Sequence, residues 1–428
     1  MVAPSWPSVI PCGIMGDARE DIDFAAAERE CREETDRLIR DHGPRLAGTT
    51  ACLNVAERIA ESLRGFSASV RIDTIGIHPA SFYAYTKILP VSYAIGMLAL
   101  LSVGLLRLLP VAGLVAGIAL MVCQFGLYRH LGDSFFPARV GKNIEAVIEP
   151  VEGAQRELIL SGHHDSAPVA RIFSGPFSRL YGAAIFVPYI FFLVELAVLL
   201  ARFLGAPAHL LHGWPLPFLT IGVPFVVGYF CLVAVRRGSP GAGDNLIASV
   251  MVASLGREIA TRKNSLLRTT RLRIVSFDAE EAGLRGASAY FTTHAASLKG
   301  LPCTHLNFDS LYSLRDLQVL TSDINGTVPL SRPLADRIVD CARECGYRAR
   351  LFSLIFGAGG TDAAESARRG IPSTSIIAMP TEIIRDGLVY HTPRDTVENI
   401  EPGIVEACMR IFLCYLGTLE AGADGERQ

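Results

Sequence analysis

The stretch Leu158-Ile159-Leu160-Ser161-Gly162-His163-His164-Asp165 begins like a buried strand and ends in reactive side chains. A short apolar run of strand length enters a small-residue turn, and two imidazoles and a carboxylate follow within three residues. α/β enzymes present functional groups at the carboxyl ends of strands. Because side chains alternate along an extended chain, His163 and Asp165 point to one side, so His163 can bind a metal ion that Asp165 supports from behind. A solvated strand end is the alternative explanation of this pair.

Similar groups follow other predicted elements downstream. One carboxylate lies in a glycine-flanked turn at the head of a helix, a Glu-Glu pair and an aspartate each follow a predicted strand, and an imidazole lies in a late loop. These residues are Asp244, Glu280 and Glu281, Asp309, and His391. In a doubly wound sheet such positions share one crevice, so we expect the dispersed residues to converge.

The alternation of strands and helices outside the apolar runs predicts the fold class. Short β-rich runs alternate with amphipathic helical runs, which favours a three-layer α/β/α architecture around a mixed, largely parallel sheet. Residues 70–75 alternate as an edge strand should. Residues 143–149 and 157–161 are predicted to be neighbouring strands, and Thr49 or Thr50 is predicted to cap a helix that ends near Arg64.

Composition indicates a membrane protein. Half of the 428 residues are apolar and only 19% are charged, which is unusual for a soluble enzyme. A net charge of −2 gives no electrostatic reason to expect a nucleic-acid partner. The ten cysteines form no CxxC pair, so we expect buried thiols in a reducing compartment rather than a disulfide framework. The first 17 residues lack the pattern of a cleaved signal peptide.

Four apolar runs form two predicted transmembrane hairpins. The first hairpin spans residues 88–128 and the second spans residues 180–236, and each run is about long enough to cross a bilayer as a helix. A helical hairpin buried in a large soluble core is the alternative. Glu195, within the second hairpin, is a functional group, a helix-end partner of Arg202 or a protonated carboxyl that faces the inside of the bundle.

The part of the chain outside the hairpins is predicted to lie on the cytoplasmic face. Both hairpins return the chain to the side that it left, so the rest of the protein lies on one face of the membrane. Eight basic residues flank the spans on that face, and the connections on the other face carry only Arg107 and Arg202. The positive-inside rule therefore places the larger part in the cytoplasm. The eight residues are Lys87, Arg129, Arg139, Lys142, Arg171, Arg179, Arg236 and Arg237.

Two imidazoles and three carboxylates are ligands that suit zinc. If Asp244 bridges two ions, one ion takes His163 and Asp309 and the other takes Glu281 and His391. Glu280, beside a ligand, is then positioned as a general base. Each carboxylate also has a simpler explanation as a helix cap, a helix-start charge or a turn former. Asp362, after Gly359-Gly360-Thr361, is most simply interpreted as a cap.

The ordered motifs resemble those of the co-catalytic zinc aminopeptidases, a family that also contains glutamate carboxypeptidase and glutaminyl cyclase. The motifs are His163-x-Asp165-Ser166, Pro240-Gly241-Ala242-Gly243-Asp244-Asn245, Glu280-Glu281-Ala282-Gly283-Leu284-x-Gly286, Asn307-Phe308-Asp309 and Tyr390-His391-Thr392-x-x-Asp395-Thr396. Gly43-Pro44-Arg45-Leu46-Ala47-Gly48 and Gly141-Lys142-Asn143 also resemble N-terminal segments of the family. The likeness runs from about Asp17 to the end, apart from the two hairpins.

The resemblance implies a zinc-exopeptidase fold and a set of roles. The implied zinc ligands are His163, Asp244, Glu281, Asp309 and His391, and the implied catalytic residues are Glu280 as base, Asp165 behind His163, and Tyr390. Tyr390 matches a position where some members steady the oxyanion, although a packed loop aromatic explains it equally well. His164 replaces a usual aromatic and is expected to tune the site or add a ligand. Leu246-Ile247-Ala248 replaces a small Ser-Gly pair, which makes the local packing uncertain.

The sequence therefore predicts a membrane-bound aminopeptidase with two zinc ions per chain, which acts on peptides and contacts the lipid bilayer. The alternatives are a single-zinc acyl transferase like glutaminyl cyclase and a catalytically silent membrane scaffold. The choice between removal of N-terminal and of C-terminal residues stays open, as do residue preference and oligomeric state. The peptidase domain is predicted in three pieces, at residues 1–87, 129–179 and 237–428, separated by the hairpins.

Overall fold

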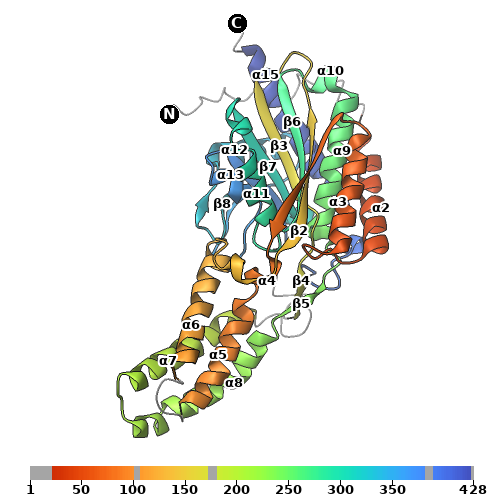
Figure 1. The fold of residues 1–428 in the computed structure, drawn as a ribbon. Coiled ribbons are helices and arrows are strands. Elements are labelled where there is room, and N and C mark those ends of the chain that lie inside the picture. Colours follow the sequence, from red (N-terminus) through yellow and green to blue (C-terminus); the bar gives the residue numbers. More distant parts are fainter. Residues whose placement is uncertain (1–21, 101–106, 172–180, 381–388, 426–428) are drawn as a thin grey trace.

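The computed structural model describes residues 22–100, 107–171, 181–380 and 389–425. They form a mixed α/β domain from whose lower end four helices project (Figure 1). The α/β domain contains the sheet, and the projecting helices come from the two apolar insertions.

A nine-stranded mixed sheet runs through the α/β domain of the described chain. Its order is β1-β2-β6-β3-β7-β11-β8-β10, with β9 paired to β8. The strands are β1 Ser69–Ile77, β2 Arg139–Ile148, β3 Arg156–His163, β6 Thr270–Phe277, β7 Cys303–Leu311, β8 Gln318–Asp323, β9 Val328–Pro329, β10 Arg350–Ser353 and β11 Ser373–Ala378. The centre, β6-β3-β7-β11, is parallel. Strands β2 and β8 run antiparallel to their central neighbours β6 and β11, and β1 runs antiparallel to β2.

Two local predictions are confirmed and one pairing is wrong. Residues 70–75 lie in the edge strand β1, and Thr49 caps the helix Thr50–Arg64 by accepting a hydrogen bond from the Cys52 backbone N–H. The strands at 143–149 and 157–161 are not neighbours, because β6 lies between β2 and β3. Strand order depends on long-range pairing, which local patterns do not contain.

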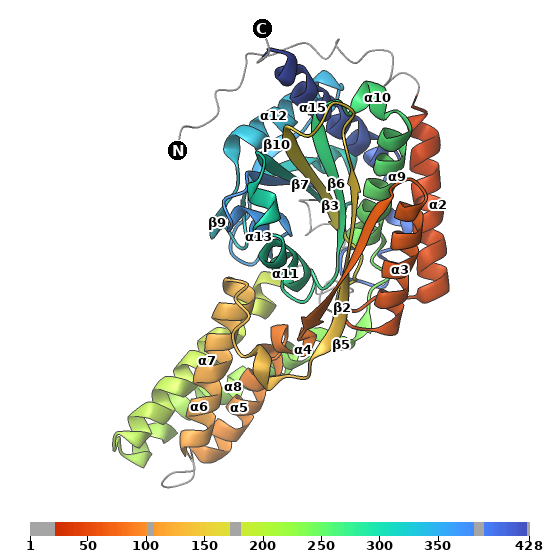
Figure 2. The same cartoon turned by 45° about the horizontal axis from the view of Figure 1, so that its top comes forward.

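Helices cover both faces of the sheet (Figure 2). One face carries α3, α9, α12 and α15, with α2 outside α3 and α9, and the other face carries α11 and α13. The helices of this domain are α2 Phe24–His42, α3 Thr50–Arg64, α9 Ile247–Thr261, α10 Lys263–Leu266, α11 Arg285–Thr293, α12 Arg332–Glu344, α13 Ala363–Ala367 and α15 Ile404–Gly425.

Strand β3 is apolar without alternation because both of its faces are buried. Leu158 and Leu160 belong to the core beneath α9 and α15, whereas Ile159 packs with Phe277 and Phe291 on the face of α11. All three side chains of the run are fully buried. A parallel strand covered by helices on both faces requires such a run.

Both insertions leave the sheet at the edge where β3 and β6 end. Ile77, the last residue of β1, pairs with Arg139, the first residue of β2, so the first insertion begins and ends at this edge. The second insertion follows His163 and returns before Asp244, through the small sheet of β4 Pro168–Ala170 and β5 Val233–Gly238. The short helix α4 Pro79–Phe82 leads into the first insertion.

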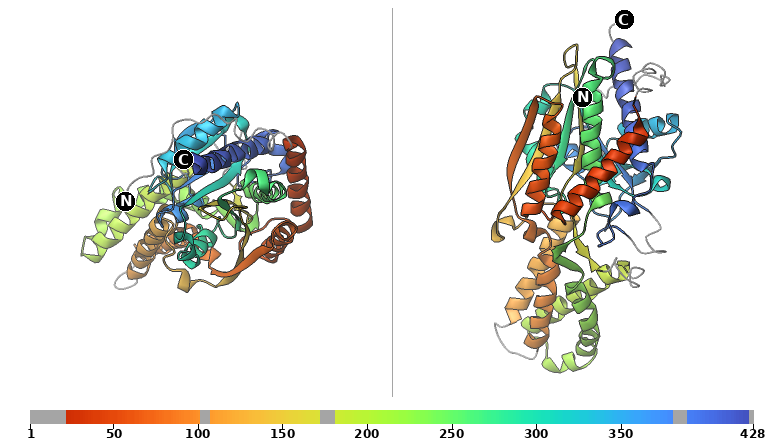
Figure 3. Two further views of the ribbon diagram at one scale, coloured as in Figure 1. Left: turned by 90° about the horizontal axis from the view of Figure 1, so that it is seen from above. Right: turned by 90° about the vertical axis from the view of Figure 1, so that its right-hand side faces the viewer.

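The insertions form one bundle of α5 Tyr85–Ala99, α6 Leu108–Leu120, α7 Tyr181–Phe203 and α8 Pro215–Phe230 (Figure 3). A π-helical turn, Met121–Gly126, continues α6. Leu89, Leu114, Phe192, Leu199 and Leu219 are fully buried between these helices. Each hairpin therefore packs on the other as well as on itself.

Among the described residues, two helices are long and apolar enough to cross a bilayer. Leu108–Gly126 and Ala183–Phe203 meet this criterion, and Pro215–Phe230 is a shorter apolar helix. Part of the first predicted run, residues 101–106, lies outside the described residues, as does Leu180. Four spans therefore stay a prediction, as do the boundaries of the hairpins and of the three peptidase pieces.

Two glycines of α8 have different surroundings. Gly222 allows a close contact with α7, whereas no close contact requires a glycine at Gly228. A Cβ atom on Gly222 would lie 2.4 Å from the ring of Phe191, whereas a Cβ atom on Gly228 would meet nothing within 4 Å. Gly222→Ala should therefore destabilise the bundle by about 1–3 kcal/mol through overpacking. Gly228→Ala should stabilise the helix by up to about 1 kcal/mol.

Thermal unfolding of the two variants in detergent tests this packing. The melting temperature should fall for Gly222→Ala and should hold or rise for Gly228→Ala. Equal shifts in both variants would show that α8 does not pack against α7 at Gly222.

Candidate metal centre

The structure brings the dispersed residues together at the carboxyl edge of the sheet. His163 ends β3, Glu280 and Glu281 follow β6, and Asp309 lies in β7 near its end. Asp244 lies in the irregular turn Ala242–Leu246 that precedes α9. His391 comes from the loop after β11 and completes the group.

Asp244 lies between the two imidazoles. His163 Nε2 is 3.4 Å from Asp244 Oδ1, and His391 Nε2 is 3.0 Å from Asp244 Oδ2. On the first side, His163 Nε2 is 3.8 Å from Asp309 Oδ2. On the second side, His391 Nε2 is 3.0 Å from Glu281 Oε1. The residues thus form two groups of three that share Asp244, one with His163 and Asp309 and the other with Glu281 and His391.

The chemistry of these side chains fits metal ions. His163 Nε2 and Asp309 Oδ2 are buried and have no hydrogen-bond partner within the described part of the chain. Such orphaned polar atoms are costly unless a ligand satisfies them. Imidazole nitrogen and carboxylate oxygen are the donors that zinc takes in hydrolytic sites.

Electrostatics leads to the same conclusion. Burial raises the pKa of Glu281 to about 8, with His391 opposing the shift and Asp244 adding to it. Burial also raises the pKa of Asp309 to about 7, against His163 and with Asp244. The pKa of Glu280 lies well above its ordinary value, first because of burial, although His163 opposes this shift. These carboxyls are crowded and desolvated, and a bound cation would favour their charged forms.

Backbone geometry at the centre is constrained. Ala279, Ser310 and His391 all have positive φ, at 56°, 50° and 54°. Ala279 precedes Glu280, Ser310 follows Asp309, and His391 belongs to the cluster itself. Such φ values are uncommon for residues with a Cβ atom. Strain of this kind persists where the surroundings fix the backbone, which is typical of functional sites.

Asp165 lies behind the centre, as the spacing predicts. Its Oδ1 is 3.2 Å from His163 Nδ1, and its two oxygens accept the backbone N–H groups of Glu280 and Glu281 at 3.1 and 3.2 Å. One buried carboxylate therefore orients an imidazole and holds the Glu-Glu turn.

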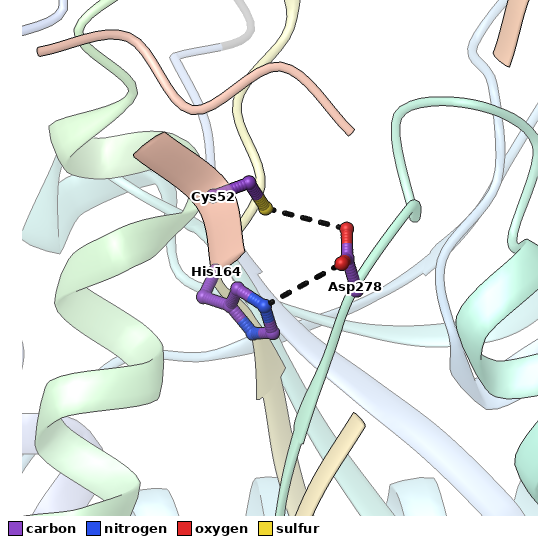
Figure 4. A group of neighbouring side chains, drawn as sticks. All are labelled: Cys52, His164 and Asp278. Atoms are coloured by element: carbon purple, nitrogen blue, oxygen red, sulfur yellow. Dashed lines mark hydrogen bonds and ion pairs between the residues drawn. The ribbon is translucent and has the colours of Figure 1, made fainter. Parts of the chain in front are cut away.

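His164 points away from this centre. Its Nδ1 is 2.9 Å from Ser276 Oγ, and its Nε2 is 4.0 Å from Asp278 Oδ2, which lies beside Cys52 (Figure 4). The Cys52 thiol donates to Asp278 Oδ1 over 3.3 Å. Because neighbouring side chains of a strand point to opposite faces, His164 lies in this separate buried group and not among the five clustered residues.

Tyr390 stacks on His391, with ring centroids 3.7 Å apart and planes 17° apart. Burial raises the pKa of its hydroxyl well above the ordinary value, and Asp244 and Glu281 add to this shift. The phenol therefore keeps its proton and can donate a hydrogen bond. The packing places Tyr390 beside His391 at the centre.

Two residues of the centre were not recognised from the sequence. Asp362 occupies the N-cap position of α13 as predicted, but its side chain makes no cap hydrogen bond. Its carboxyl is fully buried, has no hydrogen-bond partner among the described residues, and interacts electrostatically with His163 and Asp309. Arg45, which we quoted only within a segment that resembles the N-terminal part of the family, is fully buried and donates to the carbonyls of His164, Pro240 and Gly241.

Leu246, Ile247 and Ala248, which stand where the family has a small Ser-Gly pair, pack in the hydrophobic core. All three residues are fully buried beneath the sheet in the cluster that contains Leu158 and Leu160. The larger side chains therefore lie in the packed core of the domain.

Asp165→Asn should weaken zinc binding about 10- to 100-fold, because the amide cannot support His163 as a carboxylate does. Competition with a chromogenic chelator measures the zinc dissociation constants. Asp336→Asn, at an exposed position of α12, is the matched control and should leave them unchanged. Unchanged zinc affinity in Asp165→Asn, with a normal melting temperature, would contradict the supporting role.

Part of the chain matches a known protein family. Residues 226–416 match the sequence model of peptidase family M28. This match includes Asp244, Glu280, Glu281, Asp309 and His391, and it begins after His163. No curated protein matches the chain in sequence.

Solved structures share the fold at low sequence identity. A zinc aminopeptidase from Bacillus subtilis superposes with a TM-score of 0.54 and 16% identity, covering 92% of this chain and 95% of its own. A glutaminyl cyclase from Bacteroides thetaiotaomicron gives 0.54 and 12%, covering 92% and 97%. A Zn-dependent exopeptidase from Parabacteroides distasonis gives 0.53 and 14%, covering 92% and 98%. The family match and the shared fold support the resemblance to M28 zinc peptidases and glutaminyl cyclases.

Proposed function

We propose that the protein is a membrane-bound zinc aminopeptidase with two metal ions per chain. The observation that carries this proposal is the position of Asp244, whose two oxygens lie within 3.4 Å of two different imidazoles. A carboxylate shared in this way is suited to bridge a pair of ions. His163 and Asp309 would hold one ion and Glu281 and His391 the other, with Asp244 common to both.

Zinc, when bound, supplies Lewis acidity that polarises a peptide carbonyl and acidifies water. Glu280 belongs to neither group of three that shares Asp244. It lies close to His163 and Glu281, with its Oε2 3.8 Å from His163 Nε2. It is therefore placed to take a proton from the attacking water and pass it to the leaving amine. The Tyr390 hydroxyl is the candidate donor to the oxyanion, and burial keeps that hydroxyl protonated.

A single-zinc acyl transferase is the second candidate, because glutaminyl cyclases share this fold as closely as the aminopeptidases do. The two groups of three ligands favour the dinuclear hydrolase over this candidate. A silent scaffold is disfavoured, because every carboxylate and imidazole of the predicted ligand set is present at the centre.

Metal content and turnover of Glu280→Gln test the assignment. The purified wild-type protein should bind about two zinc ions per chain by elemental analysis and cleave aminoacyl anilides. Glu280→Gln should retain its zinc but lose turnover about 10²- to 10⁴-fold, because the general base is removed. One tightly bound zinc in the wild type would favour the cyclase, and retained turnover in Glu280→Gln would refute the base.

We further propose that the helical bundle lies in the membrane with the α/β domain on the cytoplasmic face. Two long apolar helices and the basic residues around the bundle support this orientation. A cytoplasm-dependent reporter fused after Gln428 should be active, and an export-dependent reporter at the same position should be silent. The reverse pattern would place the peptidase domain outside the cytoplasm.

A further inference from the structure

A cavity of about 690 Å³ extends from the metal centre into the helical bundle. At one end its wall contains Asp244, Glu280, Glu281, Asp309 and His391. Among the described residues that line it, these are the only ones with ionisable acidic, basic or imidazole side chains. The end of the cavity at the metal centre is therefore polar. The rest of its described wall carries no acidic, basic or imidazole side chain.

The other end of the cavity is lined by both insertions. Ile118 and Phe125 come from α6 and its continuation, Ile185 and Tyr189 come from α7, and Tyr229 comes from α8. The hydroxyls of Tyr189 and Tyr229 hydrogen-bond to each other, so the rings can line the cavity without an unpaired polar group. The insertions thus supply an apolar wall that begins at the catalytic residues.

The mouth of the cavity is also apolar. Phe186, Leu193, Ile355 and Phe356 line the cavity and are nevertheless exposed, with Leu193 55% and Ile355 71% accessible. The rings of Phe186 and Phe356 lie 6.1 Å apart, which joins α7 to the loop after β10. An apolar molecule could therefore enter between the bundle and the sheet without crossing a polar rim there.

The volume of this cavity is larger than one amino-acid side chain of a peptide substrate would fill. Pockets of 300–1,000 Å³ hold whole drug-sized ligands and are mostly apolar with a few polar groups that orient the ligand. The cavity has this composition, with its carboxylates and its imidazole confined to the metal centre. An occupant that complements it has one polar, reactive end and one long apolar part.

We propose that the substrate is an amphiphilic amide, in which a continuous apolar chain longer than any standard side chain extends from the scissile bond into the bundle. This proposal rests on the function proposed above, because it needs a centre that hydrolyses amides. Water oxygen bonds to the carbonyl carbon, the C–N bond breaks, and the amine leaves with a proton, giving a carboxylate and an amine. The bundle then acts as part of the substrate site and not only as an anchor.

Two series of compounds test the proposal with the full-length protein in one detergent. The first series extends the acyl side, from 2-aminobutanoyl to 2-aminododecanoyl p-nitroanilide. The second series extends the amine side, from leucine butylamide to leucine dodecylamide. In one of the series kcat/KM should rise about three- to fourfold per added methylene until the cavity is filled.

Variants that fill the cavity separate its effect from partition into detergent. Ile118→Trp and Ile185→Trp place a larger ring in the cavity wall. Their matched controls are Val115→Trp and Ile190→Trp, on the same two helices at positions that are exposed and do not line the cavity. The lining variants should lose at least tenfold in kcat/KM for the longest chain and less than twofold for leucine p-nitroanilide. The control variants should retain the chain-length profile of the wild type.

The outcomes distinguish the two proposals. Turnover of leucine p-nitroanilide without any dependence on chain length in either series would overturn the amphiphilic substrate and leave the aminopeptidase standing. An equal loss in lining and control variants would also overturn it, because the profile would then reflect the detergent. Absence of turnover with every compound by a zinc-loaded protein would instead refute the proposed function.

Discussion

The buried guanidinium of Arg45 holds together the loops on which the metal centre depends. It donates to the carbonyls of His164, Pro240 and Gly241 at 2.7–2.8 Å. These carbonyls belong to the loop after His163 and to the loop before Asp244, which the second insertion separates in sequence. Charge-assisted bonds to three carbonyls offset the cost of burying this cation. Together with the bonds that Asp395 and Phe308 accept from Gly243 and Asn245, they fix His163 and Asp244 relative to each other.

This arrangement explains which parts of the centre were predictable from the sequence. His163, Glu280 and Glu281 follow apolar strands, and local patterns reveal strand ends. The convergence of these ends follows from a parallel sheet, so it was predictable without knowing the strand order. The position of β6 between β2 and β3 was not predictable, because strand pairing depends on contacts between distant residues.

Residues missed by sequence reasoning had adequate local explanations. Asp362 stands before a short helix and resembles a cap, and Arg45 lies in a Gly-Pro turn where an exposed position is expected. Their roles depend on which groups surround them after folding. For Asp362 these are His163 and Asp309, and for Arg45 they are the carbonyls of two distant loops. Motif spacing identifies groups that recur at strand ends, and it does not identify groups that act through tertiary packing.

The position of the insertions has a consequence for the site that hydropathy alone does not show. Strand β2 runs antiparallel to β6, so its first residue, Arg139, lies at the edge where β6 ends, and β1 ends beside it. The first insertion therefore has to emerge beside the Glu280-Glu281 turn, and the second emerges directly after His163. Two apolar hairpins that leave the sheet at the carboxyl edge of its central strands pack together there and form a wall of the cavity at the candidate metal centre. The topology of the sheet thus places the two apolar insertions beside the metal centre.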